Sequence, residues 1–218
     1  EQGNGHGHNH HHDELKLDKD INIAPGYKVM ADGIKVKRNT LIESDVYVNE
    51  LDNQGDITGD IWEFGETPMF TTMPPFKFAP AGNENATAPR NGELVLEPGD
   101  YHHVKAEDYS MLTFSGGVYN IEKLEAKKYS HVRFLAPTEI RIEKELKIKK
   151  DVYVGPAGGN EYALPSEIIF YIDDEHHHHH EHHHHSHHLA KLEDRVEFWG
   201  TIYAPGGKVE LKKENNFT

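Results

Sequence analysis

A repeat of 20 residues constrains this chain more than any other feature of its sequence. Residues 104–114 align with residues 124–134, and side chains of the same kind recur at matching places. The matching pairs are Ala106/Ala126, Tyr109/Tyr129, Ser110/Ser130, Leu112/Val132 and Phe114/Phe134. Apolar and polar residues alternate within each copy, as is typical of a β-strand. Short strands at a fixed spacing predict an all-β fold, a β-solenoid (β-helix) whose ~20-residue coils stack on one another.

An antiparallel meander in a β-sandwich is the alternative fold, because its strands also recur regularly. The residue-for-residue match favours the solenoid. In that fold each coil buries its inward side chains against the neighbouring coils. We therefore expect a set of apolar side chains to point inward and to stack in register, namely Leu112, Phe114, Val132, Phe134, Val152 and Val154.

The rest of the chain divides into a short arm and one domain. Residues 1–13 are rich in Gly, Asn and His and are expected to form a flexible arm. Residues 14–218 are expected to form the single β-solenoid domain, with two interruptions. Residues 65–91 contain five prolines, which predicts a long surface excursion without regular pairing. Residues 173–195 are expected to be a His-rich inserted loop.

Two histidine clusters predict metal binding, because imidazole is the commonest protein ligand for zinc, copper and nickel. The candidate ligands are His6, His8, His10, His11, His12, His176, His177, His178, His179, His180, Glu181, His182, His183, His184, His185, His187 and His188. Such runs offer many alternative ligand sets, so we expect adaptable capture of a divalent transition metal and no catalytic centre. The alternatives are a purification tag, or a solvated loop that becomes charged as the pH falls towards ~6.5.

Two further groups of residues are weaker candidates. His102 and His103 are adjacent in an expected strand, where neighbouring side chains point to opposite faces, so we do not expect them to share a metal. A third cluster offers oxygen ligands that could hold calcium, namely Asp52, Asn53, Asp56 and Asp60. Its spacing does not match an EF-hand loop, and a polar turn is the favoured interpretation.

Composition narrows the classes of function. The formal net charge of −14 disfavours nucleic-acid binding and suits the binding of cations. The chain has no cysteine, which excludes disulfides and thiolate metal sites. No apolar run reaches transmembrane length. A first residue other than Met and two glycosylation sequons, at Asn85 and Asn216, suit a secreted protein. We find no nucleophile motif, phosphate-binding loop or carboxylate pair, so we do not expect an enzyme.

Several segments resemble one protein family. They are residues 94–101, 112–119, 132–137, 140–142, 151–154, 168–171 and 198–205, with weaker matches at 44–48 and 55–59. Together they are similar to the β-solenoid domain of unknown function found in bacterial surface and pilus-assembly-associated proteins. The resemblance covers about residues 40–215 and implies an extracellular, right-handed, non-enzymatic solenoid. The family supplies no catalytic residues to carry over, and the His-rich tract departs from its pattern.

These observations predict a secreted, cell-surface structural protein, a filament subunit that binds divalent transition metal. A monomeric metal-scavenging or adhesive module is the alternative. For the filament, we expect residues 14–17 to pair with the open sheet edge of a neighbouring subunit, head to tail. The competing possibility is that residues 14–24 fold back on their own chain and give a monomer.

Overall fold

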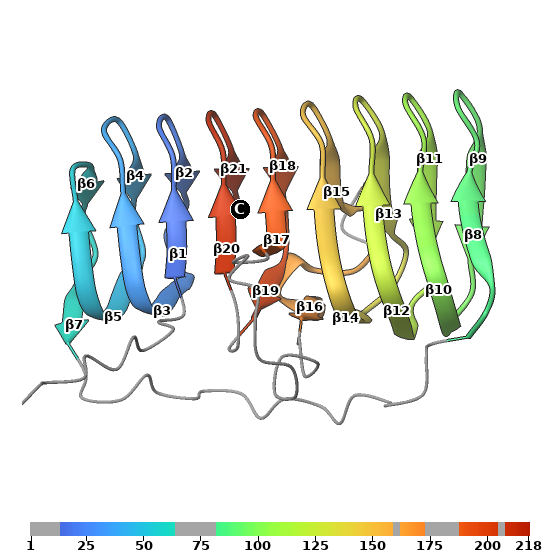
Figure 1. The fold of residues 1–218 in the computed structure, drawn as a ribbon, viewed down its shortest axis with the longest axis horizontal. Helices are drawn as coiled ribbons and strands as arrows, with labels where there is room; N and C mark the ends of the chain where they lie inside the picture. The colour runs from blue at the N-terminus through green and yellow to red at the C-terminus, as the bar shows by residue number, and fades with distance from the viewer. Residues whose placement is uncertain (1–13, 64–81, 159–161, 173–187, 205–207) are drawn as a thin grey trace, which may run out of the picture.

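The computed structural model describes residues 14–63, 82–158, 162–172, 188–204 and 208–218. These residues form β-strands joined by tight turns, together with one short 3-10 helix, η1 (Pro165–Glu167). All the strands pair in parallel, and they lie in two large sheets that are layered against each other (Figure 1). Apolar side chains from both sheets fill the space between the layers.

The larger sheet has 12 strands and the smaller one has nine. The larger sheet contains β1 (Glu14–Leu17), β3 (Lys28–Val36), β5 (Asp45–Asn53), β7 (Ile61–Glu63), β8 (Asn85–Ala88), β10 (Gly99–Ala106), β12 (Gly117–Ala126), β14 (Thr138–Ile148), β16 (Ile168–Ile172), β17 (His188–Leu192), β19 (Thr201–Tyr203) and β20 (Lys208–Leu211). The smaller sheet contains β2 (Asn22–Ile23), β4 (Leu41–Ile42), β6 (Asp56–Ile57), β9 (Glu93–Leu96), β11 (Met111–Phe114), β13 (His131–Phe134), β15 (Tyr153–Pro156), β18 (Glu197–Phe198) and β21 (Asn216–Phe217).

The prediction of a right-handed β-solenoid with coils stacked in chain order is wrong. The strands build two layered parallel sheets, and their order in those sheets is not the order of the sequence. In the larger sheet the order is β7-β5-β3-β1-β20-β17-β14-β12-β10-β8. The last strands of the chain therefore lie in the middle, and β7 and β8 lie at opposite edges (Figure 1). A local repeat fixes which residues pair between neighbouring strands, but it carries no information about the order of distant segments.

The register inferred from the repeat is confirmed. Phe114 pairs with Phe134 in the smaller sheet, and their fully buried rings stack 5.2 Å apart. Ala106 pairs with Ala126 in the larger sheet. The other side chains expected to point inward, Leu112, Val132, Val152 and Val154, are also buried.

Most of the turns that lead from the larger to the smaller sheet share one backbone conformation. Eight of them, all except the turn from β5 to β6, contain a non-glycine residue with φ between 56° and 62°, in the left-handed region that most side chains avoid. These residues are Asp20, Asn39, Asn91, Tyr109, Tyr129, Asp151, Arg195 and Glu214. The exposed rings of Tyr109 and Tyr129 stack with centroids 4.9 Å apart, as the repeat suggested.

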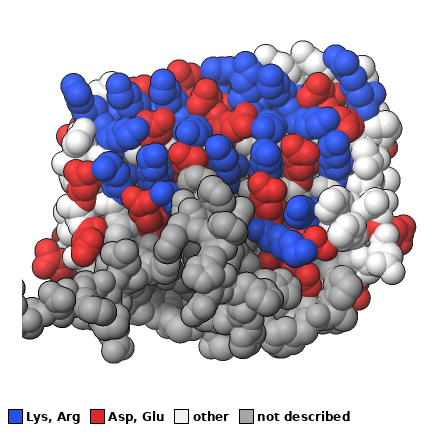
Figure 2. Space-filling view, in the orientation of Figure 1, with Lys and Arg blue, Asp and Glu red and all other residues white. Residues whose placement is uncertain are grey.

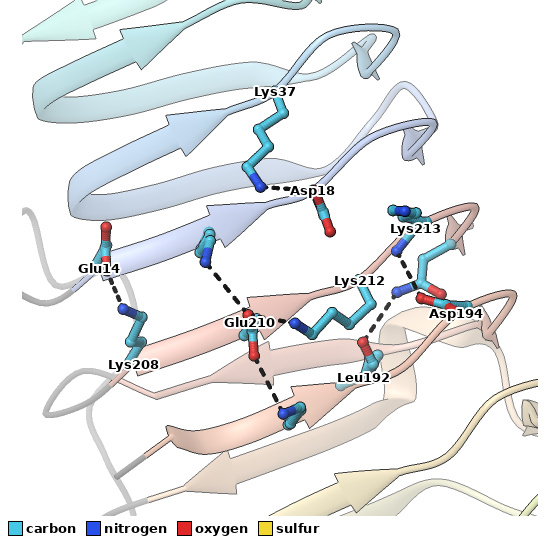
Figure 3. Close-up of polar contacts among 12 residues, drawn as sticks. Glu14, Asp18, Lys37, Leu192, Asp194, Lys208, Glu210, Lys212 and Lys213 are labelled. Carbon is cyan, nitrogen blue, oxygen red and sulfur yellow. Dashed lines mark hydrogen bonds and ion pairs between the residues drawn. The ribbon is translucent and has the colours of Figure 1, made fainter. Parts of the chain in front are cut away.

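A joint between β1 and β20 brings the two end regions of the chain together (Figure 3). Leu17 pairs with Leu211, and the Asp18 N–H donates to the Leu211 carbonyl at 2.9 Å. Ion pairs cross the joint: Lys16 Nζ lies 3.5 Å from the buried carboxylate of Glu210. Residues 14–17 therefore pair within their own chain, and the expected pairing with a neighbouring subunit is replaced by the fold-back alternative.

The expected arm, residues 1–13, lies outside the described residues, and the two expected interruptions are partly described. The end of the segment 65–91 forms β8, which pairs with β10. The end of the segment 173–195 forms β17, which lies between β14 and β20. Strand pairing thus begins earlier in both segments than their composition indicated, because each strand gains a ready-made parallel partner.

Candidate metal centre

The sequence-predicted metal ligands fall almost entirely outside the described residues. His6, His8 and His10–His12 precede Glu14, and the tract from His176 to His187 lies between β16 and β17. His188 is the one exception, because its backbone begins β17 and pairs with Lys208. Metal binding by these tracts stays a prediction.

The oxygen-rich segment at 52–60 does not form a compact ligand group in the described structure. Asp52 forms an ion pair with Lys35 at 3.1 Å, and the side chain of Asn53 accepts a hydrogen bond from the backbone N–H of Gly55. The backbone N–H of Asp60 donates to the side chain of Asp45. These contacts are those of a polar turn, which was the favoured interpretation.

The structure assembles a different group of potential ligands, from His102, His103 and Glu122. Each offers a nitrogen or oxygen atom, and these three atoms all lie within 4.8 Å of one another. His102 Nδ1 lies 2.6 Å from Glu122 Oε2. The two imidazole rings stack in parallel, with centroids 4.2 Å apart. Within the described residues, this is the one place where three such side chains come so close.

A bend in the long strands explains why two adjacent histidines share a side. The ladder between β10 and β12 pairs Tyr101 with Ile121 and His103 with Lys123, but leaves out the residues in between. The ladder between β12 and β14 shifts register over the same residues. Such an irregularity interrupts the alternation of side chains and turns the strand. The expectation that His102 and His103 point to opposite faces is therefore wrong.

The sequence did carry a signal for this group. The 20-residue offset that pairs Val104 with Leu124 also places His102 beside Glu122, two residues earlier. The alternation of polar and apolar residues also breaks there, because Glu122 and Lys123 are two polar residues in succession. Extending the repeat towards the N-terminus would have identified the carboxylate partner of the histidine pair.

The electrostatics of the group favour an ionised carboxylate. Glu122 is 6% exposed, and burial alone would raise its pKa, but hydrogen bonding and charge from Lys144 and the neighbouring His102 lower it below the usual value. Lys144 Nζ lies 2.9 Å from Glu122 Oε1. Burial lowers the pKa of His103, and the nearby His102 and Lys123 lower it further, which favours the neutral imidazole that binds metals.

The donor set fits a divalent transition metal. Two imidazoles and one carboxylate are a ligand set that zinc uses when it keeps a position for water, with bonds of about 2.0–2.2 Å. Such bonds require the ligand atoms to be closer together than 4.8 Å. The His102 side chain is partly exposed and His103 is exposed, so their rings are able to turn towards a shared ion. Copper and nickel accept the same imidazole ligands.

The outer face of the larger sheet is strongly charged but largely ion-paired. Rows of Lys and Arg alternate with Asp and Glu across the strands (Figure 2). Glu107, for example, lies between Lys105 at 2.9 Å and Lys127 at 2.8 Å. Because cross-strand pairs of this kind neutralise one another, the face is a solvated surface rather than a single-sign patch.

The part of the chain described here has no helix with the length and hydropathy of a membrane span. The resemblance to bacterial surface and pilus-assembly-associated proteins stays a prediction, since no protein-family model, curated protein or solved structure matches this chain.

Proposed function

We propose that this chain is a structural protein that binds a divalent transition metal ion, with His102, His103 and Glu122 as a defined binding centre. The observation that carries the proposal is the convergence of two imidazoles and a buried carboxylate at a bend where strand alternation would have separated them. The abundance of further histidines in the same chain supports a role in metal binding. The extracellular location and the filament expected from the sequence stay predictions.

The centre is built on a rigid support, which favours a specific geometry over adaptable capture. His102 and His103 belong to β10, and Glu122 belongs to the adjacent β12. The His102 backbone N–H donates to the Glu84 carbonyl at 2.8 Å, and the His103 N–H donates to Asn85 Oδ1 at 3.2 Å. Ligands fixed by a sheet require less ordering when an ion binds than ligands on a free loop.

Diffraction from zinc-soaked crystals of the full chain tests this proposal directly. Anomalous scattering at the zinc edge should place an ion about 2.0–2.2 Å from atoms of His102, His103 and Glu122. Calorimetry should show that the double variant His102→Asn/His103→Asn loses one binding site per chain while other sites persist. An ion elsewhere, or unchanged stoichiometry and affinity in that variant, would reject the centre.

A further inference from the structure

The outer face of the smaller sheet carries two aromatic side chains on neighbouring strands, β15 and β18. Tyr153 belongs to β15, and Trp199 directly follows β18. The adjacent strand β13 adds His131, which pairs with Tyr153, and Arg133, which pairs with Gly155. The three strands lie side by side (Figure 1). All four side chains are at least partly exposed, so a ligand is able to reach them.

Gly155 makes room for the Tyr153 ring. A Cβ at position 155 would lie 2.8 Å from Tyr153 Oη and 2.9 Å from Trp199 Cβ, which is closer than packed atoms approach. The Tyr153 ring therefore occupies the space that a side chain at position 155 would fill. Tyr153 Oη donates to the Pro156 carbonyl at 2.9 Å, so the ring extends along its own strand and is held at its polar end.

Trp199 is held in a similar way. Its indole Nε1 donates to Glu197 Oε1 at 2.9 Å, two residues back along the chain. Phe198 is fully buried, so strand alternation places Glu197 and Trp199 on the outer face. Because both aromatic rings are tied at their polar ends, little side-chain freedom would be lost when a ligand stacks on them.

Arg133 is an unpaired cation beside these rings. In the part of the chain that the structure describes, its guanidinium forms no hydrogen bond or ion pair. By contrast, Lys127 and Lys144 are paired with carboxylates at 2.8 Å and 2.9 Å. No acidic residue is among the outward-facing residues beside Arg133 on β11, β13 and β15, which are Met111, Thr113, His131, Tyr153 and Gly155. Arg133 is therefore available to an anionic group of a ligand.

We propose that this face binds a saccharide that contains a uronic acid, with Tyr153 and Trp199 against the sugar rings and Arg133 on the carboxylate. The C–H groups on one side of a sugar ring carry a partial positive charge, which suits the negative face of an aromatic ring. The planar fork of a guanidinium matches the two oxygens of a carboxylate. The proposal goes beyond metal binding and does not depend on it.

The mixture of groups favours an acidic saccharide over other ligands. A purely apolar partner would bury the charge of Arg133 without an ion pair, which is costly. A nucleic acid also stacks on aromatic rings, but its dense negative charge is repelled by a chain with a net charge of −14. Sugar hydroxyls suit the carboxylate of Glu197 and the imidazole of His131. Burial and the charge of Arg133 lower the pKa of that imidazole, which favours its neutral form.

Two disaccharides that differ in one group provide the probe. Cellobiouronate has a carboxylate where cellobiose has a hydroxymethyl group, and both offer the same sugar rings. The protein is the full chain freed of metal with EDTA, so that no ion bridges the sugar to a histidine. A pH of about 8 keeps the histidines neutral, which prevents the His-rich tracts from attracting the carboxylate by charge.

The fluorescence of Trp199 reports binding at the site itself. The chain has two tryptophans, so Trp62→Phe leaves Trp199 alone. Trp62 belongs to β7, at the far edge of the larger sheet. Cellobiouronate added to about 10 mM should change the emission of this variant saturably, which detects a dissociation constant up to roughly that value. Calorimetry of the unaltered chain should give the same affinity.

Variants separate the contribution of charge from that of stacking. Arg133→Gln should weaken the binding of cellobiouronate roughly tenfold and leave that of cellobiose unchanged. Tyr153→Leu, which keeps an apolar side chain but removes the ring, should weaken the binding of both sugars. Arg38→Gln, an equal change of charge at an exposed site in the turn between β3 and β4, is the matched control and should bind as the wild type does.

Circular dichroism identifies the variants that fold, and the affinities of those variants decide the proposal. A wild type that binds neither disaccharide, or both with equal affinity, would overturn it. So would a folded Arg133→Gln variant that binds cellobiouronate as tightly as the wild type, or an equal loss of affinity in Arg38→Gln.

Discussion

Arg195 binds Asp151 with two nitrogens, although 44 residues separate them in the sequence: Nε lies 2.5 Å from Oδ1 and Nη2 lies 2.9 Å from Oδ2. The two residues occupy equivalent left-handed positions in neighbouring turns. The hydrogen bonds and charge of Arg195 lower the pKa of Asp151 below its usual value.

This pair predicts how stability depends on pH. A carboxylate whose pKa is lower in the folded state stabilises the fold above its unfolded value of about 3.9, and the contribution is lost as the pH falls through the folded value. Arg195→Gln should therefore lower the melting temperature slightly at pH 7, and the difference should vanish in acid. Arg38→Gln, at an exposed arginine without an ion pair in the described structure, should show no such pH dependence. A difference in melting temperature that persists in acid would contradict the assignment of this stability to the ion pair between Arg195 and Asp151.

Glu214→Asn should stabilise the protein. Glu214 has φ of 58°, a conformation that glutamate adopts at a cost and that asparagine tolerates better. Asn39 and Asn91 already occupy the equivalent turn position. The contact that would be lost, from Arg195 to Glu214 at 3.9 Å, is long and exposed. We expect a gain of less than about 1 kcal/mol in the free energy of unfolding by urea denaturation. A decrease in the free energy of unfolding would mean that the left-handed backbone conformation of residue 214 does not dominate the effect of the substitution.

Phe114→Ala should destabilise the fold strongly. The Phe114 ring is fully buried, stacks on Phe134 and contacts Tyr119 edge-on, with ring centroids 4.8 Å apart. Truncating such a ring costs about 3–5 kcal/mol in the free energy of unfolding. Val118→Ala, at a 38% exposed position, should cost less than about 0.5 kcal/mol. Similar losses in the two variants would show that the interior is not packed as described.

Lys144→Met should raise the affinity of the proposed centre for zinc. The ammonium of Lys144 lies 2.9 Å from Glu122 and would repel an ion bound there. Removing it should tighten binding roughly three- to tenfold, which corresponds to about 0.7–1.4 kcal/mol. Lys147→Met, in the same strand but opposite Glu125, is the matched control and should leave the affinity unchanged. Equal effects in both variants would indicate only a change in net charge.

Removal of residues 176–187 should leave the fold intact. Ile172 pairs with Ile142 of β14, and Ala190 pairs with Leu146 of the same strand. Only three residues of β14 therefore span the distance that the connection from Ile172 to Ala190 must span. After the deletion, residues 173–175, His188 and Leu189 remain to make that connection. The deletion should spare His188 because it belongs to β17. Calorimetry should show fewer metal sites per chain, with the His102/His103/Glu122 site retained. An unchanged number of sites would exclude the tract as a ligand source.

Some of this structure could be predicted from the sequence, because neighbouring strands leave a local signature. The match of Phe114 with Phe134, and of Tyr109 with Tyr129, gave the register of the central strands directly. The pairing of Lys16 with Glu210 left no such signature: the shared Glu-Leu-Lys at residues 14–16 and 210–212 is offset from the true register, which pairs Leu15 with Val209. The order of distant strands in a sheet depends on which strand edges fit together, and no local sequence pattern encodes that fit.

The repeat could have given Glu122 as the partner of His102, but that His102 and His103 share a side could not be predicted, for a different reason. Strand alternation separates adjacent residues, and that rule fails only where a strand bends. The ladder between β10 and β12 leaves out the pair of His102 and Glu122, and the ladder between β12 and β14 shifts register at the same level, so this irregularity is a feature of the assembled sheet. A property of the assembled sheet thus decides whether two histidines can share a ligand.

The joint between β1 and β20 also sets an order of events during synthesis. Leu17 emerges from the ribosome about 190 residues before Leu211, which corresponds to roughly 10–40 s at usual elongation rates. Throughout that interval the β20-facing edge of β1 lacks its partner, because β20 must be synthesised before it can cover that edge. Glu14 and Lys16 place charged side chains on β1 while this edge is unpaired, and such charges oppose pairing with other strands. The residues that later form ion pairs with Lys208 and Glu210 therefore also protect the nascent chain from premature pairing.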